Sequence, residues 1–205
     1  MKKVIVAFVL LTCSVAAFSQ SEISEKKMKY GISLGLNYSN LMFVDFQPTN
    51  TTIDNGLGFN LGILADYKLT NWLSFSPKSE LAFNNCKVNY SSGNSENETY
   101  EVMPINVGLM GHFVVKKQNN NVSPYLFFGP QYQLSLMRNQ RSITDDFATN
   151  DSFALDFGIG LEKGFKHFNF APELRYSYGF NNVNQNPALS LLHFHNISLI
   201  FNFLG

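Results

Sequence analysis

Apolar and polar residues alternate one by one along most of the chain after residue 29. From Tyr30 to Tyr38 every second residue is aromatic or aliphatic, and the residues between are Gly, Ser or Asn. A β-strand places successive side chains on opposite faces, so this spacing predicts strands with one apolar face and one small or polar face. A helix would need apolar residues three and four positions apart. The pattern recurs eight times, in segments 30–38, 57–67, 73–83, 103–113, 126–136, 153–161, 168–178 and 197–203.

Two kinds of feature interrupt the alternation. Near Asn84 and Asn85 the phase slips by one position, so that Cys86 and Val88 carry the apolar face, and a β-bulge would produce that shift. Prolines also fall inside the predicted strands. Because proline has no N–H to donate to a ladder, we expect them at bulges or at the membrane boundary. These prolines are Pro77, Pro104, Pro130 and Pro172.

The connections between the predicted strands alternate in character. Those at 68–72 and 164–167 are tight, and the one at 116–123 is intermediate. An outer-membrane barrel is typically built this way, with short periplasmic turns and longer external loops. The sequence therefore predicts an all-β chain that folds as an eight-stranded antiparallel up-and-down transmembrane β-barrel. The long or polar connections are 40–56, 91–99, 139–151 and 179–195.

The apolar face could point either way. In a soluble periplasmic ligand-binding β-barrel it would pack inward, whereas in a membrane barrel it would meet lipid. The opposite face is rich in Gly, Ser and Asn, which suit a narrow lumen and make an unusual water-facing surface. Aromatic residues with a polar atom also lie near the segment ends, where interfacial belts form, and both features favour lipid. These aromatic residues are Tyr30, Tyr38, Tyr67, Trp72, Tyr90, Tyr100, Tyr125 and Tyr178.

The amino end has the three regions of a secretory signal peptide. Lys2 and Lys3 precede an apolar run, and residues 17–19 supply the small-x-small pattern of a cleavage site. We expect residues 1–19 to be removed and residues 20–205 to form the barrel domain. A membrane anchor is the alternative, although the run is shorter than the ~20 residues that a spanning helix needs.

The two cysteines predict no disulfide framework. Cys13 leaves acylation after cleavage open as a lipoprotein alternative, but Thr12 before it fits that signal poorly. Removal of residues 1–19 would leave Cys86 as the only thiol, and one cysteine forms no internal disulfide.

Composition narrows the function classes. The 205 residues contain 15 Lys and Arg against 15 Asp and Glu, which argues against a nucleic-acid partner because such proteins carry an excess of basic residues. The hydrophobic fraction of 45% argues against a disordered chain.

The polar face of the predicted strands carries charged residues that would point into the lumen. If the turn near Gly164 pairs residues whose numbers sum to about 331, Asp156 lies opposite Arg175. We interpret these charges as a structural plug of salt bridges, with a gate or small-ion path as the alternative. An eight-stranded barrel is just wide enough for side chains, which argues against a diffusion pore. The predicted luminal polar cluster is Lys78, Glu80, Asp156, Glu173 and Arg175, and Asp66, His112 and Glu162 share the same face.

The sequence offers little catalytic chemistry. His195 and Ser198 are three positions apart and so lie on opposite strand faces, which prevents them from acting as base and nucleophile. His193 and His195 share a face but lack a third metal ligand. No phosphate loop, paired cysteines or nucleophile elbow appears. We therefore predict no enzyme activity, no catalytic residues, no cofactor and no metal.

Several segments together resemble the PorT-like outer-membrane β-barrel proteins of Bacteroidetes. The resemblance covers most of the chain after the amino end, and residues 123–130, SPYLFFGP, are its most specific part. It implies an outer-membrane barrel without catalytic residues, and PorT itself is tied to protein secretion. One departure is the terminus, where the last aromatic residue, Phe203, lies two positions before the end. The other similar segments are 30–36, 101–104, 157–162 and 174–182.

We therefore expect an exported, monomeric barrel in the bacterial outer membrane, in contact with lipid. Its function would be a structural or interaction role at the envelope, not that of an open pore. The alternatives are an accessory role in a protein-secretion system and the soluble barrel described above. The Asn-rich external loops suit contact with envelope or secretion-system proteins, although nothing in them names a ligand.

Overall fold

The computed structural model of the chain describes residues 27–44, 47, 51–90, 98–117, 122–137, 139–141, 146–185 and 191–205. The predicted signal peptide and its cleavage site lie outside these residues. No helix among the described residues is long and apolar enough to cross a membrane.

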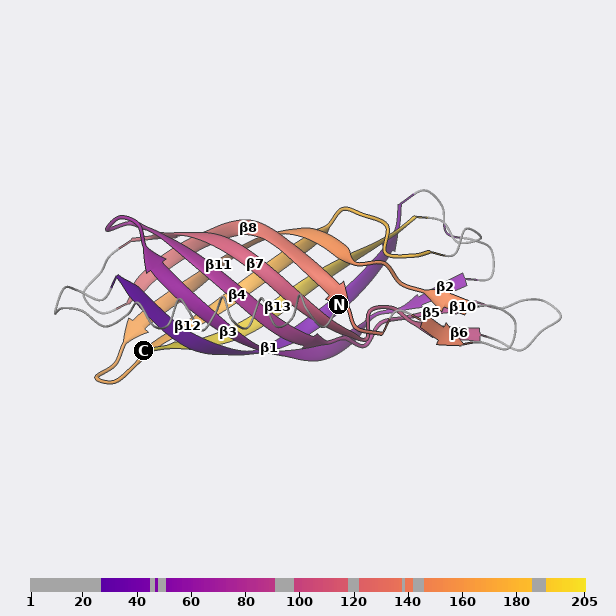
Figure 1. Cartoon of the computed structure of the whole chain (residues 1–205), viewed down its shortest axis with the longest axis horizontal. Coiled ribbons are helices and arrows are strands. Elements are labelled where there is room, and N and C mark those ends of the chain that lie inside the picture. The colour runs from indigo at the N-terminus through magenta and orange to yellow at the C-terminus, as the bar shows by residue number, and fades with distance from the viewer. Residues whose placement is uncertain are drawn as a thin grey trace, which may run out of the picture.

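The described residues form thirteen strands, of which eight close into a single antiparallel barrel (Figure 1). Each barrel strand has 11 to 16 residues, which is enough to cross a bilayer with the usual tilt. The barrel strands are β1 (Met28–Phe43), β3 (Gly56–Lys68), β4 (Leu73–Phe83), β7 (Ile105–Lys116), β8 (Ser123–Ser135), β11 (Ser152–Gly164), β12 (Asn169–Gly179) and β13 (Leu192–Leu204).

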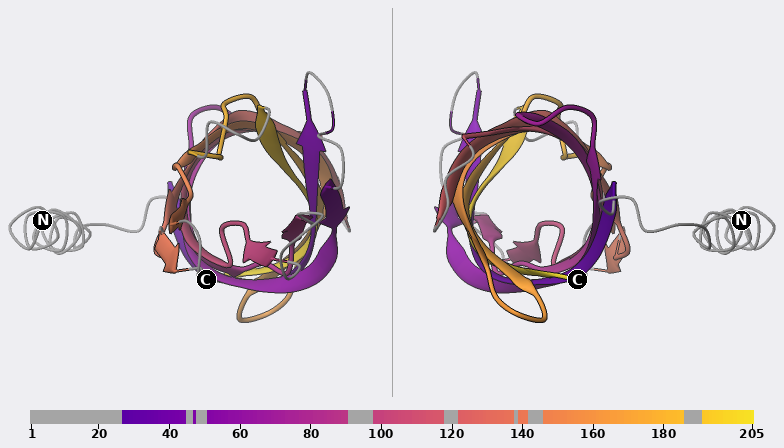
Figure 2. Two further views of the ribbon diagram at one scale, coloured as in Figure 1. Left: turned by 90° about the vertical axis from the view of Figure 1, so that its right-hand side faces the viewer. Right: turned by 90° about the vertical axis from the view of Figure 1, so that its left-hand side faces the viewer.

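The ring runs β1-β13-β12-β11-β8-β7-β4-β3, so strands that follow one another in the barrel sequence are neighbours in space. The first and last strands pair from Gly31↔Leu204 to Phe43↔Leu192, which closes the sheet and removes its edges (Figure 2). Closure matters in a bilayer because lipid offers no hydrogen-bond partner to an open edge. The predicted eight-stranded up-and-down barrel is thus confirmed.

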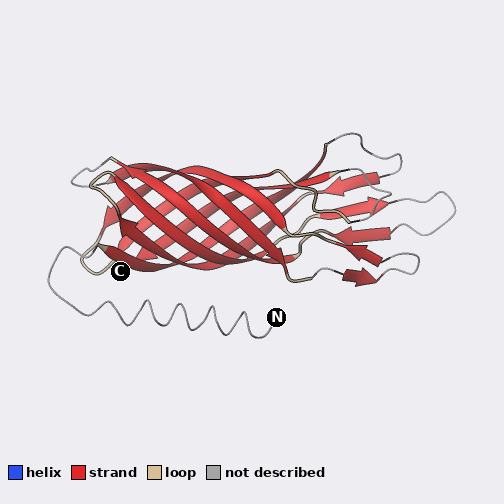
Figure 3. Ribbon diagram, turned by 45° about the horizontal axis from the view of Figure 1, so that its top comes forward, coloured by secondary structure: helices blue, strands red, loops and turns tan. Residues whose placement is uncertain are grey.

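The two ends of the barrel differ. The short β3–β4, β7–β8 and β11–β12 connections lie at one end, which we call the turn end. Tyr30 and Gly205 exchange backbone hydrogen bonds of 3.3 and 2.8 Å there. The longer connections lie at the opposite loop end, where the remaining strands project beyond the barrel (Figure 3). These are β2 (Thr51–Asp54), β5 (Lys87–Tyr90), β6 (Glu98–Glu101), β9 (Asn139–Arg141) and β10 (Asp146–Ala148).

The apolar face of the barrel points outward. Leu57 is 72% exposed and Ile63 is 64% exposed, whereas the polar residues of the opposite face are buried inside the ring. The alternative with an inward apolar face is therefore wrong. Other exposed apolar residues of the outer wall include Ile32, Leu34, Leu36, Leu61, Leu126, Phe128, Leu155, Phe157, Ile159, Leu161, Leu174, Ile197 and Leu199.

The predicted aromatic belts are partly present. Tyr30, Tyr67 and Trp72 are exposed on the outer wall at the turn end, and Tyr38 and Tyr178 are exposed toward the loop end. The prediction is wrong for Tyr100 and Tyr125, which are buried, with 6% and 5% of their surface exposed. The side chain of Tyr90 lies outside the described residues.

Three prolines lie beside gaps in the ladders rather than at bulges. Pairing stops for two residue pairs between β3 and β4 at Pro77, between β7 and β8 at Pro130, and between β11 and β12 at Pro172. The register is the same on both sides of each gap, whereas a bulge would have shifted it. Each gap follows from the missing proline N–H, which cannot donate to the ladder.

The phase slip near Asn84 is the end of a barrel strand and not the β-bulge that we predicted. Strand β4 ends at Phe83, and β5 begins at Lys87 in a separate three-stranded sheet ordered β2-β5-β6. The predicted strand start at Met103 is also wrong. This residue has a φ of 48° and is fully buried, and β7 begins at Ile105.

Candidate functional site: the luminal charge network and the loop-end head

A bidentate ion pair crosses the lumen between opposite sides of the barrel. Arg175 on β12 donates from its two terminal nitrogens to Glu80 on β4, at 3.1 and 2.6 Å. Both side chains are nearly fully buried, at 4% and 2% exposure. Asn60 also donates to Glu80, at 3.2 Å. Buried charges are costly unless they are paired and hydrogen-bonded, and this geometry supplies both conditions.

A second ion pair joins the same two strands nearer the turn end. Lys78 donates to Glu173 at 2.6 Å, and both side chains are at most 5% exposed. The hydroxyl of Tyr125 donates to the other oxygen of Glu173 at 3.0 Å. The ammonium of Lys78 also lies 5.5 Å from the ring centroid of Phe127. Glu173 therefore has a partner on each of its two oxygens.

A third pair consists of His112 on β7 and Asp156 on β11, with 2.8 Å between Nε2 and the carboxylate. Both side chains are fully buried. The predicted register between Asp156 and Arg175 is wrong: Asp156 lies opposite Ser177, and Arg175 lies opposite Gly158. Gly164 pairs with Asn169 and not with His167, as a sum of 331 would require, so the turn is centred one residue later than predicted and every partner moves by two.

The five predicted cluster residues are thus all buried in the lumen, joined in pairs that sequence spacing did not suggest. A further layer lies at the turn end. Lys116 is paired with Asp66 and Glu162, and Lys29 reaches Glu162 at 3.1 Å. Every carboxylate of these two layers therefore has a cationic or histidine partner among the described residues.

Glycine on the inner face makes room for two aromatic rings in the lumen. Gly160 lies directly between Tyr125 and Glu173 in the sheet, paired with both. A Cβ at Gly160 would collide with the Tyr125 ring, so the bare backbone lets that ring pass over β11 to reach Glu173. Phe127 lies over Gly158 in the same way. Sequence reasoning missed both rings, although they are in phase with the inward residues Gln131 and Gln133.

The loop end carries a different structure, which we call the loop-end head. It consists of strands β2, β5 and β6 and the apolar cluster that they share with the barrel strands β1 and β13. The amide of Asn84 donates to the carbonyl of Met103 at 2.8 Å, and the Cys86 thiol donates to that of Val102 at 3.1 Å. Burial, and then the charge of Glu101, raise the pKa of Cys86 to about 12. The buried members of the cluster are Leu41, Cys86, Val88, Tyr100, Val102, Met103, Val183, Leu192 and Phe194.

The histidines of β13 lie away from the luminal charges. His195 packs with its ring centroid 4.9 Å from that of Tyr178 on the outer side of the sheet, and 6.3 Å from that of His193. Ser198 is buried in the lumen, on the opposite face. The described residues contain no group of three or more His, Cys, Asp or Glu side chains that could hold a metal ion.

The fold and the filled lumen define a small β-barrel of the outer-membrane class, and the comparison with protein families agrees. A family model described as "Outer membrane protein beta-barrel domain" matches residues 18–185. The chain belongs to this family, which supports a location in the outer membrane. No curated protein matches the chain.

Two solved structures show the same fold. The chain is similar to Neisserial surface protein A (NspA), with 14% identity, a TM-score of 0.51, and coverage of 84% of this chain and 95% of that one. It is also similar to the outer membrane protein OprG from Pseudomonas aeruginosa, with 10% identity, a TM-score of 0.52, and coverage of 86% and 93%. At these identities the likeness establishes the fold and nothing further.

Proposed function

We propose that this protein is a monomeric outer-membrane barrel with a sealed lumen, whose loop-end head contacts other proteins of the bacterial envelope. The observation that carries the proposal is the head itself. Its strands pack with the loop-end parts of β1 and β13 around a buried apolar cluster of nine residues, so the described part of the head has a core of its own. Loops that served only to connect strands would need no such core.

The sealed lumen argues against a diffusion pore. Three buried pairs, each with at least one contact of 2.6 to 2.8 Å, cross the interior. Opening a path for ions would break these pairs and leave unpaired charges in a low-dielectric interior, which is costly. A structural plug therefore fits better than a gate.

The short turns would face the periplasm and the head would face outward, as in other barrels of this class. The PorT-like resemblance adds a finer proposal, an accessory role in a protein-secretion system of a Bacteroidetes envelope. Export through a cleaved signal peptide, residues 1–19, belongs to the same proposal. The chain is proposed to have no enzymatic activity and no cofactor.

Site-specific photo-crosslinking in cells tests the interaction role. A photoreactive amino acid would replace Thr52 on β2 or Thr99 on β6, both exposed on the head, and Asn71 in the β3–β4 turn as the matched control. We expect the same envelope protein to be captured from both head positions and not from the turn. Absence of any protein adduct at the head positions would contradict the proposal.

Two further readouts separate the alternatives. Discrete conductance steps of the purified protein in planar bilayers would favour the small-ion path over the plug. Loss of export of a secreted protein on deletion, with capture of a secretion component by the head, would favour the secretion role. Normal export on deletion would exclude that role and leave the general interaction role.

A further inference from the structure

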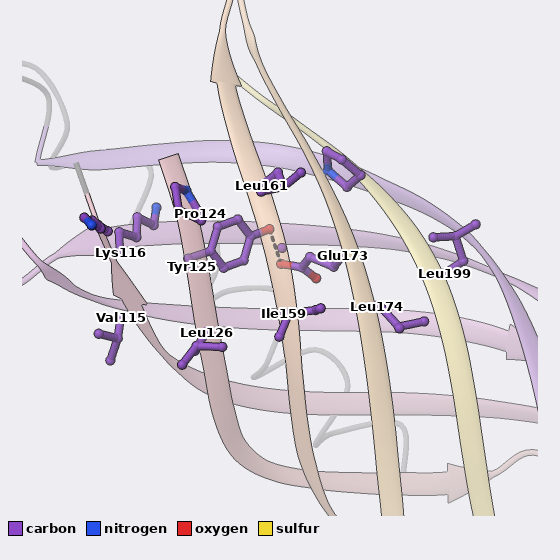
Figure 4. Close-up of a pocket in the computed structure, with 13 residues that line it drawn as sticks. Val115, Lys116, Pro124, Tyr125, Leu126, Ile159, Leu161, Glu173, Leu174 and Leu199 are labelled. Carbon is purple, nitrogen blue, oxygen red and sulfur yellow. Dashed lines mark hydrogen bonds between the residues drawn. The ribbon is translucent and has the colours of Figure 1, made fainter. Parts of the chain in front are cut away.

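The gap in the ladder at Pro172 lies in the lipid-facing wall near the turn end. Pairing between β11 and β12 is present at Gly160↔Glu173 and at Lys163↔Phe170, and it is absent between them. A groove of about 660 Å³ lies over this part of the wall and extends across β8 (Figure 4). That volume is within the range of roughly 300–1,000 Å³ typical of small-ligand sites.

The groove is apolar along its walls. Its apolar lining comes from outward side chains of five adjacent strands. It also reaches Tyr125 and Glu173, which belong to the inward face, and a small cavity of about 20 Å³ on the luminal side shares both of these residues. The apolar lining is Val115, Leu126, Ile159, Leu161, Leu174 and Leu199.

The rim at the turn end is positively charged. Lys117 lines the groove and is exposed, and Lys163 is the next outward residue after Leu161 on the same strand. Lys166 is exposed in the adjoining turn. Glu173 lines the groove and is already paired with Lys78. Glu162, next to Lys163 in the sequence, is already paired with Lys116 and Lys29. Among the described residues, the charge at the mouth that has no carboxylate partner is thus cationic, at the level where lipid headgroups would lie, and the ammonium of Lys163 lies 5.4 Å from the ring centroid of Phe165.

We propose that this groove binds one anionic glycerophospholipid, with an acyl chain in the apolar part and the headgroup phosphate against Lys117 and Lys163. The inference rests on the proposed membrane location of the barrel. An acyl chain is the ligand that matches a groove open to hydrocarbon, and the cationic rim favours a headgroup with net negative charge over a zwitterionic one. Basic residues at a membrane surface attract anionic lipids in this way.

Native mass spectrometry of the membrane-extracted full chain in mild detergent tests the proposal. The protein would be titrated with dioleoyl phosphatidylglycerol or with dioleoyl phosphatidylcholine, and the bound lipids counted. We expect one phosphatidylglycerol to bind more tightly than the rest and more tightly than phosphatidylcholine. Lys117→Gln should weaken that binding about fivefold, and Leu161→Trp should abolish it by filling the groove.

Matched controls come from the opposite side of the ring. Leu61 on β3 is as outward-facing as Leu161, and Lys27 is an exposed turn-end lysine beside β1. Leu61→Trp and Lys27→Gln should leave the tight site unchanged. Equal binding of the two lipids, or equal effects of the Leu61 and Leu161 variants, would overturn the inference.

Heat-dependent mobility in SDS gels separates this inference from the proposed function. A wild-type chain that migrates differently before and after boiling is a folded barrel, so equal lipid binding would then contradict only the groove. A chain whose mobility does not change on boiling would contradict the membrane barrel itself.

Discussion

The barrel interior and the loop-end head are both packed with buried side chains, but only the interior contains buried ion pairs among the described residues. The interior holds the pairs Glu80–Arg175, Lys78–Glu173 and His112–Asp156, all nearly inaccessible to solvent. It also holds a smaller apolar cluster of Leu64, Val114, Tyr125, Phe127, Ala171 and Leu204. The head is filled by nine apolar residues without a charged member. The difference follows from where each strand's apolar side chains are needed. Within the bilayer they face lipid and leave polar residues inside, whereas above it they turn inward, as in a soluble domain.

This contrast teaches that the two regions should respond differently to mutation. The stability of a luminal pair depends on both partners, because removing one of them leaves an uncompensated buried charge. The head is stabilised by the burial of apolar area. The free energy of unfolding that a substitution there removes should therefore scale with the side-chain volume removed.

The largest effect is expected from breaking the bidentate pair. Glu80→Leu leaves Arg175 buried without its partner and should destabilise the barrel by roughly 3–5 kcal/mol. The double variant Glu80→Leu with Arg175→Met should recover most of that loss, since neither charge remains. Urea unfolding in liposomes measures both. A double variant as unstable as the single one would show that the loss does not come from the unpaired charge of Arg175.

A loss of similar or smaller size is expected in the head, without loss of the barrel. Met103→Ala removes a fully buried side chain and should cost the head about 2–5 kcal/mol. Limited proteolysis should then cut the head, while the heat-dependent gel shift of the barrel persists. If the barrel unfolds together with the head, the two regions form one cooperative unit, which would contradict their independence.

A destabilisation of intermediate size is expected from a substitution at Gly160. Gly160→Ala places a methyl group against the ring of Tyr125 and should cost about 1–3 kcal/mol by overpacking. Tyr125→Ala in the same chain should relieve the clash, so the two substitutions should be non-additive in urea unfolding. Additive losses would indicate that the ring does not depend on the bare backbone at this position.

The last effect, absent near neutral pH, is a pH dependence confined to the head. Burial raises the pKa of Cys86 from 9.0 to about 12, so above pH 9 the thiol ionises in the unfolded head and stays protonated in the folded one. The stability of the head should therefore be unaffected below pH 9 and fall by up to about 1.4 kcal/mol per pH unit between pH 9 and 12. Proteolysis of the head at pH 8 and pH 10.5 measures this. The Cys86→Ala variant should lack that component, and an identical pH dependence in both chains would contradict it.

The eight strands could be predicted from the sequence because alternation with a period of two directly encodes which side chain faces which side. Luminal burial of Lys78 and Glu173 followed from the same parity. Their pairing did not, because β4 and β12 lie on opposite sides of the ring and the contact spans 95 residues. The predicted register of Asp156 was wrong because the centre of the β11–β12 turn was placed one residue too early.

The head could not be predicted from the sequence, for a different reason. Its strands β2, β5 and β6 have four residues each, too few to show a period. Its core residues, such as Met103, looked like the apolar positions of a barrel strand. The positive φ that ends that pattern appears only in the backbone.

The central claim is that a closed barrel meets lipid with its apolar face and is sealed by paired charges, independently of the head. The most direct test is gel mobility in SDS of the membrane-extracted chain, heated stepwise, for wild type, Met103→Ala and Glu80→Leu. The account predicts a heat-dependent shift in all three, at an unchanged temperature for Met103→Ala and at a lower temperature for Glu80→Leu. A wild-type chain with one mobility at every temperature, released from membranes by carbonate, would contradict it.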